Sequence, residues 1–373
     1  MKSIASLKGK IHGKRVLVRV DYNVEIVNGR IVDKEKIIRT LATIKFLRSQ
    51  GAVVLLMTHL GRPDGKRVKQ FSTKQFISLL KKELSLLWLG DLNDKSPKVV
   101  SVLKPGQVGI FENLRFNPLE ELNGSRLITQ MKNVADVFVN DGFSVSHRKH
   151  ASVYGIATKL PSFAGFALIS ELEAIAHTKR YMKCPSVAII GGAKVSTKFK
   201  VIDSLCKRFD HVLIGGAMAN TFYGALGYHM GASLVEKKFY KQSLSLLKKY
   251  AARIILPIDL VGRGEGKKWE ALDIGPATQK LFTSYIAIAD TLLWNGPLGK
   301  FEEKKFAKGT HVIAKALAQR SLGHAYGIVG GGETLTVVNK LKLSHSFDFV
   351  STGGGALLEY LENPALPGLV VLR

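Results

Sequence analysis

Short apolar runs recur along the whole chain, and most of them are separated by stretches with a helical spacing of apolar residues. Continuous runs rich in Val, Ile and Leu are typical of parallel strands that are buried on both faces. We therefore expect ten strands in two groups. The first group is RVLVRV (15–20), AVVLLM (52–57), VGIF (108–111) and DVFV (136–139). The second is VAII (187–190), HVLI (211–214), RIIL (253–256), TLLW (291–294), YGIV (326–329) and FDFV (347–350).

The stretch EKIIRTLATIKFLRSQG shows the helical pattern between strands. Ile37, Leu41, Ile44 and Leu47 fall near one face, and Gly51 follows as a stop signal. Strands that alternate with such helices form parallel sheets covered on both faces. Because ten strands are many for one sheet, the predicted fold is α/β with two doubly wound, Rossmann-like domains.

A predicted helix separates the two groups of strands. After Gly165 the chain reads as one helix that ends before Pro185. We expect an N-terminal domain over 1–165, a hinge helix over 166–184 and a C-terminal domain over 185–350, with 351–373 as a C-terminal segment.

Charged side chains follow the strands of the first group closely. In open parallel sheets, ligands bind beyond the carboxyl ends of the strands. The residues found there are Asp21, Asn23, His59, Arg62, Arg115, His147, Arg148 and His150. Guanidinium groups bind carboxylate or phosphate through two contacts, so this rim favours a small, multiply charged anion.

Glycine-rich turns follow the strands of the second group: GGAKVSTK, GGAMANT, NGPLGKFE, GGGET and STGGGA. Glycines let backbone amides approach phosphates, and Lys194 and Lys198 are predicted to share one face of a helix start. The sequence has no G-x-x-x-x-G-K-[ST] P-loop, and no G-x-G-x-x-G follows a strand. Helix–sheet packing would also use glycines, but five such turns on one rim favour a nucleotide site.

The stretch IVGGGETLTV (328–337) admits two interpretations. It fits an ordinary loop between a strand and a helix, because Gly tolerates positive φ and Glu-Thr suits a helix start. It also fits a phosphate bound to bare amides, with a metal ion beside the carboxylate of Glu333. One small-anion site and one nucleotide site on hinged domains suit phosphoryl transfer, in which closure aligns donor and acceptor and excludes water.

The net charge is strongly positive. Lys and Arg number 55 against 29 Asp and Glu, a formal charge of +26, and such a field attracts anions of any kind. The basic residues are spread along the chain rather than gathered in a stripe or tail, so we expect no specific nucleic-acid partner. Two cysteines, no apolar N-terminal h-region and no run long enough to span a bilayer favour a cytoplasmic protein without a membrane segment.

The ordered set of motifs resembles the phosphoglycerate kinase family over nearly the full chain. The matching stretches are RVLVRVDYNV, THLGRP, ENLRF, NDGFSVSHRKHAS, GGAKVSTK, LIGGAMANTF, LWNGPLGKFE, GGGET and STGGGALLEYLE. The resemblance implies two domains joined by a helix, with the C-terminal segment returning to the N-domain. It also implies reversible phosphoryl transfer from 1,3-bisphosphoglycerate to MgADP, giving 3-phosphoglycerate and MgATP. A large hinged kinase needs no partner chain, so we expect a monomer.

The resemblance carries roles onto residues of the first rim. Asp21 and Asn23 would hydrogen-bond the glycerate, and His59, Arg62, Arg115 and Arg148 would hold its carboxylate and phosphate. Tyr22, Leu60 and Gly61 lie in the same substrate-binding motifs.

On the glycine-rich rim, Lys194 and Lys198 would contact the moving phosphoryl group and the nucleotide phosphates. Asn295 and Glu302 lie in the nucleotide motif, with Glu302 on the ribose. Gly331, Gly332 and Thr334 would cradle phosphates, and Glu333 would bind Mg²⁺. Gly353, Gly354 and Gly355 would offer amides near the transferred group. Catalysis would come from positioning and charge neutralisation, with no side-chain nucleophile.

Three positions depart from the family pattern. Glu333 stands where the family usually has Asp, and Ala271 where it tends to have Gly near the nucleotide base. Lys36 stands where the family has an arginine at the start of the helix after the DYN motif, and Arg39 on the same face is an alternative. We assign the catalytic role to Lys36. These departures leave open a low-activity paralogue that binds phosphate ligands or nucleic acid.

Overall fold

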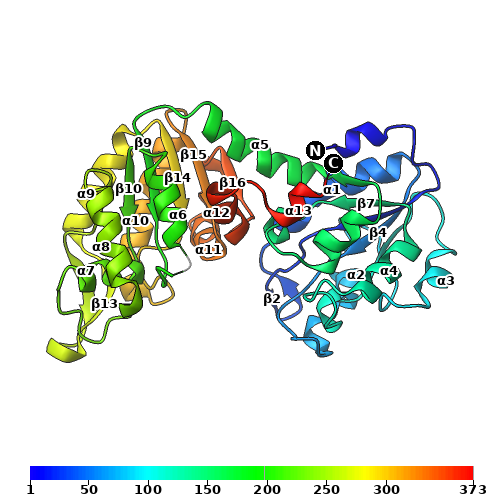
Figure 1. Ribbon diagram of the computed structural model, residues 1–373, viewed down its shortest axis with the longest axis horizontal. Helices are drawn as coiled ribbons and strands as arrows, with labels where there is room; N and C mark the ends of the chain where they lie inside the picture. The colour runs from blue at the N-terminus through cyan, green and yellow to red at the C-terminus, as the bar shows by residue number, and fades with distance from the viewer. Residues whose placement is uncertain (197, 373) are drawn as a thin grey trace. The chain divides into compact units, whose positions relative to one another are not determined.

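The computed structural model describes residues 1–196 and 198–372 and divides them into two compact units. Unit 1 holds residues 1–173 and the chain from Asn363 onward, and unit 2 holds residues 174–362. Each unit contains one six-stranded sheet flanked by helices (Figure 1). The α/β fold with two doubly wound parallel sheets is therefore confirmed.

The sheet of unit 1 has the strand order β5-β6-β4-β1-β7-β8, and all its neighbours pair in parallel. Its strands are β1 (Arg15–Arg19), β4 (Val53–Met57), β5 (Leu87–Trp88), β6 (Val108–Ile110), β7 (Val137–Asn140) and β8 (Ser162–Ala164). Its helices include α1 (Glu35–Ser49), α2 (Phe76–Leu79), α3 (Ser96–Val100), α4 (Ser125–Val134) and α13 (Pro367–Val370). A small hairpin, β2 (Ile26–Val27) with β3 (Arg30–Ile31), is added outside the sheet.

The sheet of unit 2 is also six-stranded and parallel, with the order β11-β10-β9-β14-β15-β16. Numbered along the chain within each sheet, its strands run 3-2-1-4-5-6, whereas those of unit 1 run 3-4-2-1-5-6. Its strands are β9 (Ser186–Ile190), β10 (His211–Ile214), β11 (Ile254–Ile255), β14 (Thr291–Asn295), β15 (Tyr326–Gly330) and β16 (Phe349–Ser351). Its helices are α6 (Phe199–Cys206), α7 (Ala217–Ala225), α8 (Tyr240–Lys249), α9 (Pro276–Ile288), α10 (Lys308–Ser321), α11 (Gly332–Lys340) and α12 (Gly355–Glu362). A hairpin of β12 (Leu260–Arg263) and β13 (Glu270–Ile274) lies outside the sheet.

All ten predicted strands are present, and their hydrophobic character is explained by burial on both faces. Every residue of β4 and of β9 is buried, as a parallel strand covered by helices on both sides requires. The predicted helix after the DYN motif is α1. The sequence did not indicate β5, β8 or the two hairpins, because strands of two to five residues without a long apolar run give little periodic signal.

The helix between the two groups of strands is α5 (Phe166–Arg180), which ends four residues before the predicted limit at 184. Its first half lies in unit 1 and its second half in unit 2. None of the helices in the described part of the chain combines the length and apolar character needed to cross a bilayer.

The C-terminal segment from Asn363 packs on unit 1. The amide of Gly368 donates to the carbonyl oxygen of Ser146 at 2.8 Å, and the Asn140 side chain donates to the carbonyl oxygen of Gly368 at 3.1 Å. A Cβ atom on Gly368 would lie 2.5 Å from Cγ1 of Val153, so this approach requires glycine. The tail therefore covers the loop that follows β7.

The strand order reverses between β1 and β7 in unit 1 and between β9 and β14 in unit 2. Loops that leave the carboxyl ends of these strands diverge to opposite faces and open a crevice between them. The residues that follow these four strands therefore have space for a ligand, and Asp21, Asn23, Arg148 and Lys198 are among the predicted site residues that lie there.

The buried carboxyl group of Asp141, which bonds to the first turn of α5, predicts how the stability of unit 1 depends on pH. Oδ1 of Asp141 accepts the amides of Ala167 (2.9 Å) and Leu168 (3.2 Å), and burial raises the pKa of Asp141 to about 7. The unfolded chain releases this proton near pH 4, so the stabilisation is complete below pH 4 and is lost as the pH rises through 7. Relative to Asp141→Asn, the wild type should lose on the order of 2 kcal/mol of unfolding free energy between pH 5 and 8. Urea unfolding of both proteins at pH 5 and pH 8 measures this loss, and hydrogen exchange of the β7 amides reports it for unit 1.

Asp136 supplies the control for that measurement. Its bonds with Arg15 lower its pKa, so its contribution is present above the unfolded pKa and is lost only as the pH falls. Asp136→Asn should therefore leave the change between pH 5 and 8 intact. Equal pH dependence in the wild type and in Asp141→Asn would contradict the assignment.

Candidate active site

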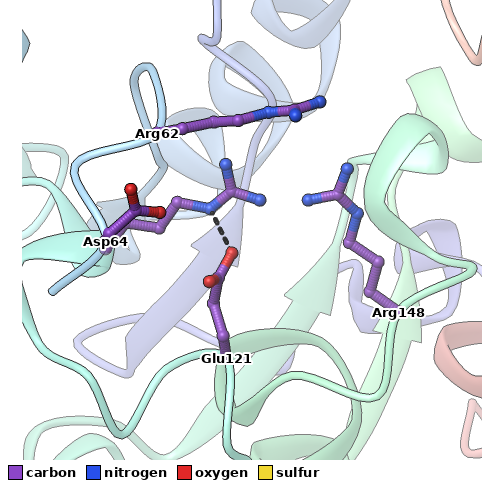
Figure 2. Close-up of a pocket in the computed structure, with 5 residues that line it drawn as sticks. Arg62, Asp64, Glu121 and Arg148 are labelled. Atoms are coloured by element: carbon purple, nitrogen blue, oxygen red, sulfur yellow. Dashed lines mark ion pairs between the residues drawn. The ribbon is translucent and has the colours of Figure 1, made fainter.

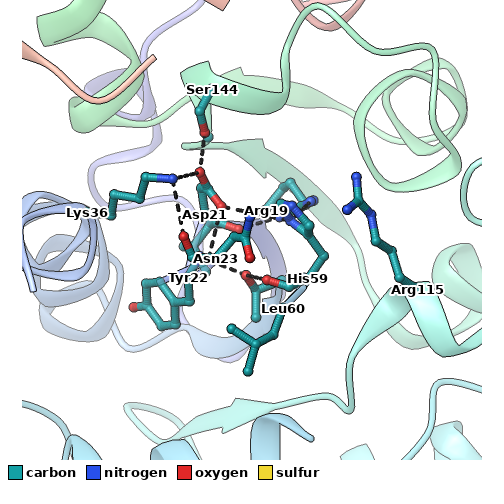
Figure 3. Close-up of polar contacts among 12 residues, drawn as sticks. Arg19, Asp21, Tyr22, Asn23, Lys36, His59, Leu60, Arg115 and Ser144 are labelled. Carbon is teal, nitrogen blue, oxygen red and sulfur yellow. Dashed lines mark hydrogen bonds and ion pairs between the residues drawn. The ribbon is translucent and has the colours of Figure 1, made fainter. Parts of the chain in front are cut away.

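The first group of predicted residues lies together in unit 1 beyond the carboxyl ends of β1, β4, β6 and β7. We call this group the basic site. It consists of Asp21, Asn23, His59, Arg62, Arg115 and Arg148 with Lys36 from α1. Figure 3 shows Asp21, Asn23, Lys36, His59 and Arg115 of this group. The strand ends meet at one edge of the sheet, which brings these distant segments into contact.

Asp21 supplies the carboxylate of the basic site, and both of its oxygens accept hydrogen bonds. Its Oδ2 accepts a hydrogen bond from Nζ of Lys36 at 2.7 Å and another from the Ser144 hydroxyl, while Oδ1 accepts the amide of Asn23 at 3.0 Å. Burial works to raise the pKa of Asp21, but the charge of Lys36 and these hydrogen bonds outweigh it, and the net pKa is lowered. Asp21 is therefore ionised at neutral pH.

Lys36 rather than Arg39 faces the basic site. Nζ of Lys36 also lies 3.3 Å from the carbonyl oxygen of Asn23. The guanidinium of Arg39 bonds to Glu35 at 2.7 Å and lies 3.6 Å from Glu171. Of the two basic residues on this helical face, Lys36 is thus the one that contacts the predicted substrate-binding residues.

His59 is neutral and its tautomer is fixed by a buried arginine. Nη2 of Arg19 lies 3.1 Å from Nδ1 of His59, and since a guanidinium only donates, Nδ1 must accept. Burial lowers the pKa of His59 well below its usual value, and the positive charges of Arg19 and Arg115 lower it further. The ring proton is therefore on Nε2, which can donate to a ligand.

A chain of hydrogen bonds holds Arg19 behind His59. Nε of Arg19 donates to the Ser152 hydroxyl at 2.9 Å, and that hydroxyl donates to Glu120 at 2.5 Å. Arg19 and Glu120 are each about 1% exposed. Arg19, Glu120 and Ser144 were not among the predicted residues. A signal existed for Arg19, because it is a charged residue inside the apolar run RVLVRV.

Asn23, Gly61 and Arg115 form a second connected set. The amide of Gly61 donates to Oδ1 of Asn23 at 2.9 Å, and Nη1 of Arg115 donates to the carbonyl oxygen of Gly61 at 2.9 Å. Gly61 has φ +65°, and a Cβ there would lie 2.5 Å from the Phe71 ring, so no other residue fits without rearrangement.

Three arginines and two carboxylates line a pocket of about 340 Å³ in the basic site. They are Arg62, Asp64, Arg115, Glu121 and Arg148 (Figure 2). Burial lowers the pKa of Arg115, and the charges of Arg148 and Arg62 lower it further. The volume is near the lower end for ligand sites, so it suits a small ligand, and three guanidinium groups suit an anionic one.

The neighbours of Arg148 keep it available to an anion. Its Nε lies 3.1 Å from Nε2 of His147. Burial lowers the pKa of His147 and of His150 to about 4 in each case, and the charge of Arg148 adds to the effect. Both histidines are neutral at pH 7, so His147 can accept from Arg148 without repelling it.

Two predicted substrate-binding residues have buried side chains. Tyr22 is fully buried, with its hydroxyl 3.1 Å from that of Thr40. Leu60 is 3% exposed, and its carbonyl oxygen accepts from Asn113 at 2.7 Å. Both side chains belong to the hydrophobic core of unit 1, next to the loops after β1 and β4.

The second group of predicted residues lies in unit 2 beyond the carboxyl ends of β9, β14, β15 and β16. We call this group the glycine-rich site; it consists of Lys194, Lys198, Asn295, Glu302, Gly331, Gly332, Glu333, Thr334, Gly353, Gly354 and Gly355. Nζ of Lys198 donates to the carbonyl oxygen of Gly191 at 2.6 Å and to Oδ1 of Asn295 at 3.0 Å. Burial lowers the pKa of Lys198 to about 8, and the charge of Glu333 opposes this shift. The ammonium group therefore lies at the point where the strand order reverses.

Hydrogen bonds fix the glycine turns of this site. Nδ2 of Asn295 donates to the carbonyl oxygen of Gly330 at 2.8 Å, and the Thr334 hydroxyl accepts the amide of Gly296 at 2.7 Å. Gly331 has φ +108°, and a Cβ there would lie 3.0 Å from Nδ2 of Asn295. The Thr334 side chain is fully buried, and its hydroxyl links the start of α11 to the turn after β14.

Two helices begin in open space at this edge. A Cβ on Gly332, at the start of α11, or on Gly355, at the start of α12, would meet no atom within 4 Å. The turns approach each other, because a Cβ on Gly354 would lie 3.9 Å from Cα of Gly331. Helix N-termini with free amides and a positive dipole bind anions, and here two are close together.

Glu333 is exposed in the first turn of α11. Within the described residues, no group of three or more His, Cys, Asp or Glu side chains could hold a metal ion. A single carboxylate beside open helix starts fits Mg²⁺, which commonly takes one or two protein carboxylates together with substrate phosphates and water.

One prediction about the glycine-rich site was wrong in its geometry. Lys194 and Lys198 do not share the face of a helix, because α6 begins only at Phe199 and both lysines precede it. Lys194 is exposed, as is Glu302 in the turn after β14. Ala271 lies in β13, buried, with its amide donating to the Ser233 hydroxyl at 2.9 Å.

Comparisons with known proteins point to one family. The family model described as phosphoglycerate kinase matches residues 6–364. The phosphoglycerate kinase of Moorella thermoacetica is 42% identical over 389 aligned positions, covering 97% of each chain. That of Deinococcus radiodurans is 39% identical and covers 100% of this chain and 94% of its own.

Solved structures agree with the sequence relatives. The structure of phosphoglycerate kinase from Coxiella burnetii gives a TM-score of 0.84 at 36% identity, covering 99% of this chain and 98% of that one. The enzyme from Pyrococcus horikoshii OT3 gives 0.86 at 28% identity, covering 100% and 98%.

The buried position of Lys198 predicts a titration that NMR can detect. Because burial lowers its pKa to about 8, one lysine of the ligand-free protein should lose its charge about two pH units before an ordinary lysine. The side-chain 13Cε resonances of the lysines, followed from pH 6 to 11, should show one early transition that disappears in Lys198→Met. The same experiment on Lys194→Met should retain it. An early transition that survives Lys198→Met would contradict the assignment.

Proposed function

Because this chain belongs to the phosphoglycerate kinase family, we propose that its basic site binds 3-phosphoglycerate and its glycine-rich site binds the adenine nucleotide. The protein is a phosphotransferase of glycolysis that transfers a phosphoryl group reversibly from 1,3-bisphosphoglycerate to ADP, giving 3-phosphoglycerate and ATP. Nothing in the comparisons favours a low-activity paralogue. The residue roles, the metal and the two domain assignments are our proposal.

The pocket of Arg62, Arg115 and Arg148 is the observation that carries the proposal for the basic site. A three-carbon acid with a phosphate has two anionic ends, and two-point contacts with guanidinium groups hold such groups strongly. Nε2 of His59 supplies a neutral donor to an anionic oxygen, with its tautomer fixed by Arg19.

Asp21 and Asn23 would orient the glycerate. The lowered pKa of Asp21 supports a role as acceptor, because an ionised carboxylate can accept from the substrate hydroxyl. Lys36, held by Asp21, would place a positive charge beside the acyl phosphate oxygens. Orientation and charge neutralisation are the main sources of catalysis in phosphoryl transfer, and no side-chain nucleophile is required.

Lys198 and backbone amides would hold the nucleotide phosphates. The amides of Gly331, Gly332 and Thr334 lead into α11, and those of Gly353, Gly354 and Gly355 lead into α12. We propose that Asn295 positions Lys198 and that Lys194 approaches the phosphates from the exposed loop. The exposed Glu302 would reach the ribose.

Glu333 would hold Mg²⁺ together with the nucleotide phosphates. When bound, the ion would neutralise phosphate charge and orient the nucleotide. Glu has one methylene more than the Asp that is usual in the family, and its exposed position gives it room to adapt.

We further propose a cytoplasmic monomer that works on small molecules, with no specific nucleic-acid partner. The glycolytic reaction supports this view, since it needs only small substrates. The absence of a membrane-crossing helix from the described residues and two cysteines without a disulfide are consistent with it. The domain closure predicted from the sequence stays a prediction.

Arg148→Ala tests the basic site. It should raise the KM for 3-phosphoglycerate about 10- to 100-fold, because one charge-assisted contact is lost, and leave the KM for ATP near the wild-type value. The coupled assay of 1,3-bisphosphoglycerate formation from 3-phosphoglycerate and ATP measures both. Arg126→Ala, which removes an exposed arginine paired with Asp94, is the control and should change neither constant. An unchanged KM for 3-phosphoglycerate in Arg148→Ala would remove this arginine from the site.

Lys36→Ala tests the catalytic role. It should lower kcat by about 10²- to 10³-fold, the usual cost of removing one charge-stabilising donor from an active site. Lys36→Arg should keep most of the rate, because the charge remains. Arg39→Ala should leave kcat within about threefold, since Arg39 is paired with Glu35 and Glu171. Normal turnover in Lys36→Ala with loss in Arg39→Ala would reverse the assignment.

A further inference from the structure

We propose that Glu121 is an internal counter-ion that occupies part of the anion site on Arg115 and must leave when the substrate binds, so that it sets the affinity for 3-phosphoglycerate. This inference rests on the proposed binding of that substrate in the arginine pocket. It concerns a residue that no step of the reaction requires.

The hydrogen bonds of Arg115 show which of its donors Glu121 occupies. Nη1 donates to the carbonyl oxygen of Gly61, so this corner of the guanidinium is held by the protein. Nε lies 3.0 Å from Oε1 of Glu121 (Figure 2). The side-on edge that a phosphate or carboxylate would use for a two-point contact consists of Nε and Nη2. Glu121 therefore holds one of the two donors of this edge.

The surroundings explain why a carboxylate is held there. Arg62 and Arg148 line the same pocket, and their charges lower the pKa of Arg115 while Glu121 opposes them. Without a ligand, three guanidinium groups around 340 Å³ repel one another, and a carboxylate among them reduces this cost. A bound phosphate would supply the same compensation, so the two anions are alternatives at Arg115.

Exposure distinguishes Glu121 from the glutamate beside it. The Glu120 side chain is 1% exposed and is held by both the amide and the hydroxyl of Ser152. The Glu121 side chain is 49% exposed, while that of Arg115 is 6% exposed. Glu121 can thus rotate into solvent at little cost, whereas Glu120 and Arg115 are fixed. Asp64 lines the same pocket from the turn after Arg62 and adds a second negative charge.

Glu121→Gln tests the proposal because it removes the charge and keeps the size. Isothermal titration of 3-phosphoglycerate should give a Kd about two- to fivefold lower than in the wild type, the range expected when one partly exposed ion pair no longer competes. Inorganic phosphate should show a decrease of similar size. Asp64→Asn should give a smaller decrease. The Kd for ADP should not change in either variant.

Asp136→Asn is the matched control, because it removes one negative charge at the amino end of β7, on the opposite edge of the same sheet. Its Kd for 3-phosphoglycerate should equal that of the wild type, which separates competition in the pocket from a change in net charge. Glu121→Ala, once circular dichroism has shown that it is folded, should also bind 3-phosphoglycerate at least as tightly as the wild type. Weaker binding in both Glu121 variants would show that Glu121 positions Arg115 productively and would overturn the proposal.

The same titrations separate this inference from the proposed function. If Arg148→Ala loses 3-phosphoglycerate binding and Glu121→Gln leaves the Kd unchanged, the pocket is the substrate site and only the competition is wrong. If Arg148→Ala binds normally, the pocket is not the substrate site and both proposals fail.

Discussion

Mutual repulsion among Arg62, Arg115 and Arg148 is the constraint on which the arrangement of the basic site depends. Three guanidinium groups beside one pocket favour an anion, but they destabilise the ligand-free protein. Two neighbouring glutamates that differ in solvent exposure reduce this repulsion. Glu120 is buried and bonded to Ser152, whereas Glu121 is half-exposed and pairs directly with Arg115. The buried acid stabilises the scaffold, and the exposed acid can give way to a ligand.

Burial also decides the protonation states around these arginines. The pKa of His59 is lowered by burial and by neighbouring positive charge, so the ring stays neutral and adds no further repulsion. Asp21 shows the opposite outcome, because Lys36 and hydrogen bonds outweigh the effect of burial and keep it ionised. The basic site thus combines fixed positive charges, one fixed neutral donor and one fixed acceptor, which is what recognition of a phosphorylated hydroxy acid requires.

Each unit has a six-stranded parallel sheet, but the residues at the strand ends differ in kind between the two units. In unit 1 long side chains project from the strand ends, and hydrogen bonds such as that between Gly61 and Asn23 hold their loops. In unit 2 the corresponding turns carry few side chains, and the open starts of α11 and α12 present backbone amides. Side chains give specificity for one small substrate, while amides and helix dipoles suit phosphates of a nucleotide.

The sequence by itself determined the fold class and the edge of each sheet at which the predicted site residues gather. Continuous apolar runs locate the ten main strands, because a strand buried on both faces must be apolar throughout, and the parallel arrangement then brings their following residues to one edge. The tertiary structure decided how the side chains of these residues are oriented and paired. It turned Lys36 towards Asp21 and Arg39 towards Glu35 and Glu171, although both lie on the same helical face. It buried Thr334, and it brought in Arg19 and Glu121, which the sequence did not single out. Spacing along a chain fixes the face on which a residue lies, but side-chain orientation depends on charges and hydrogen bonds from segments that only folding brings together.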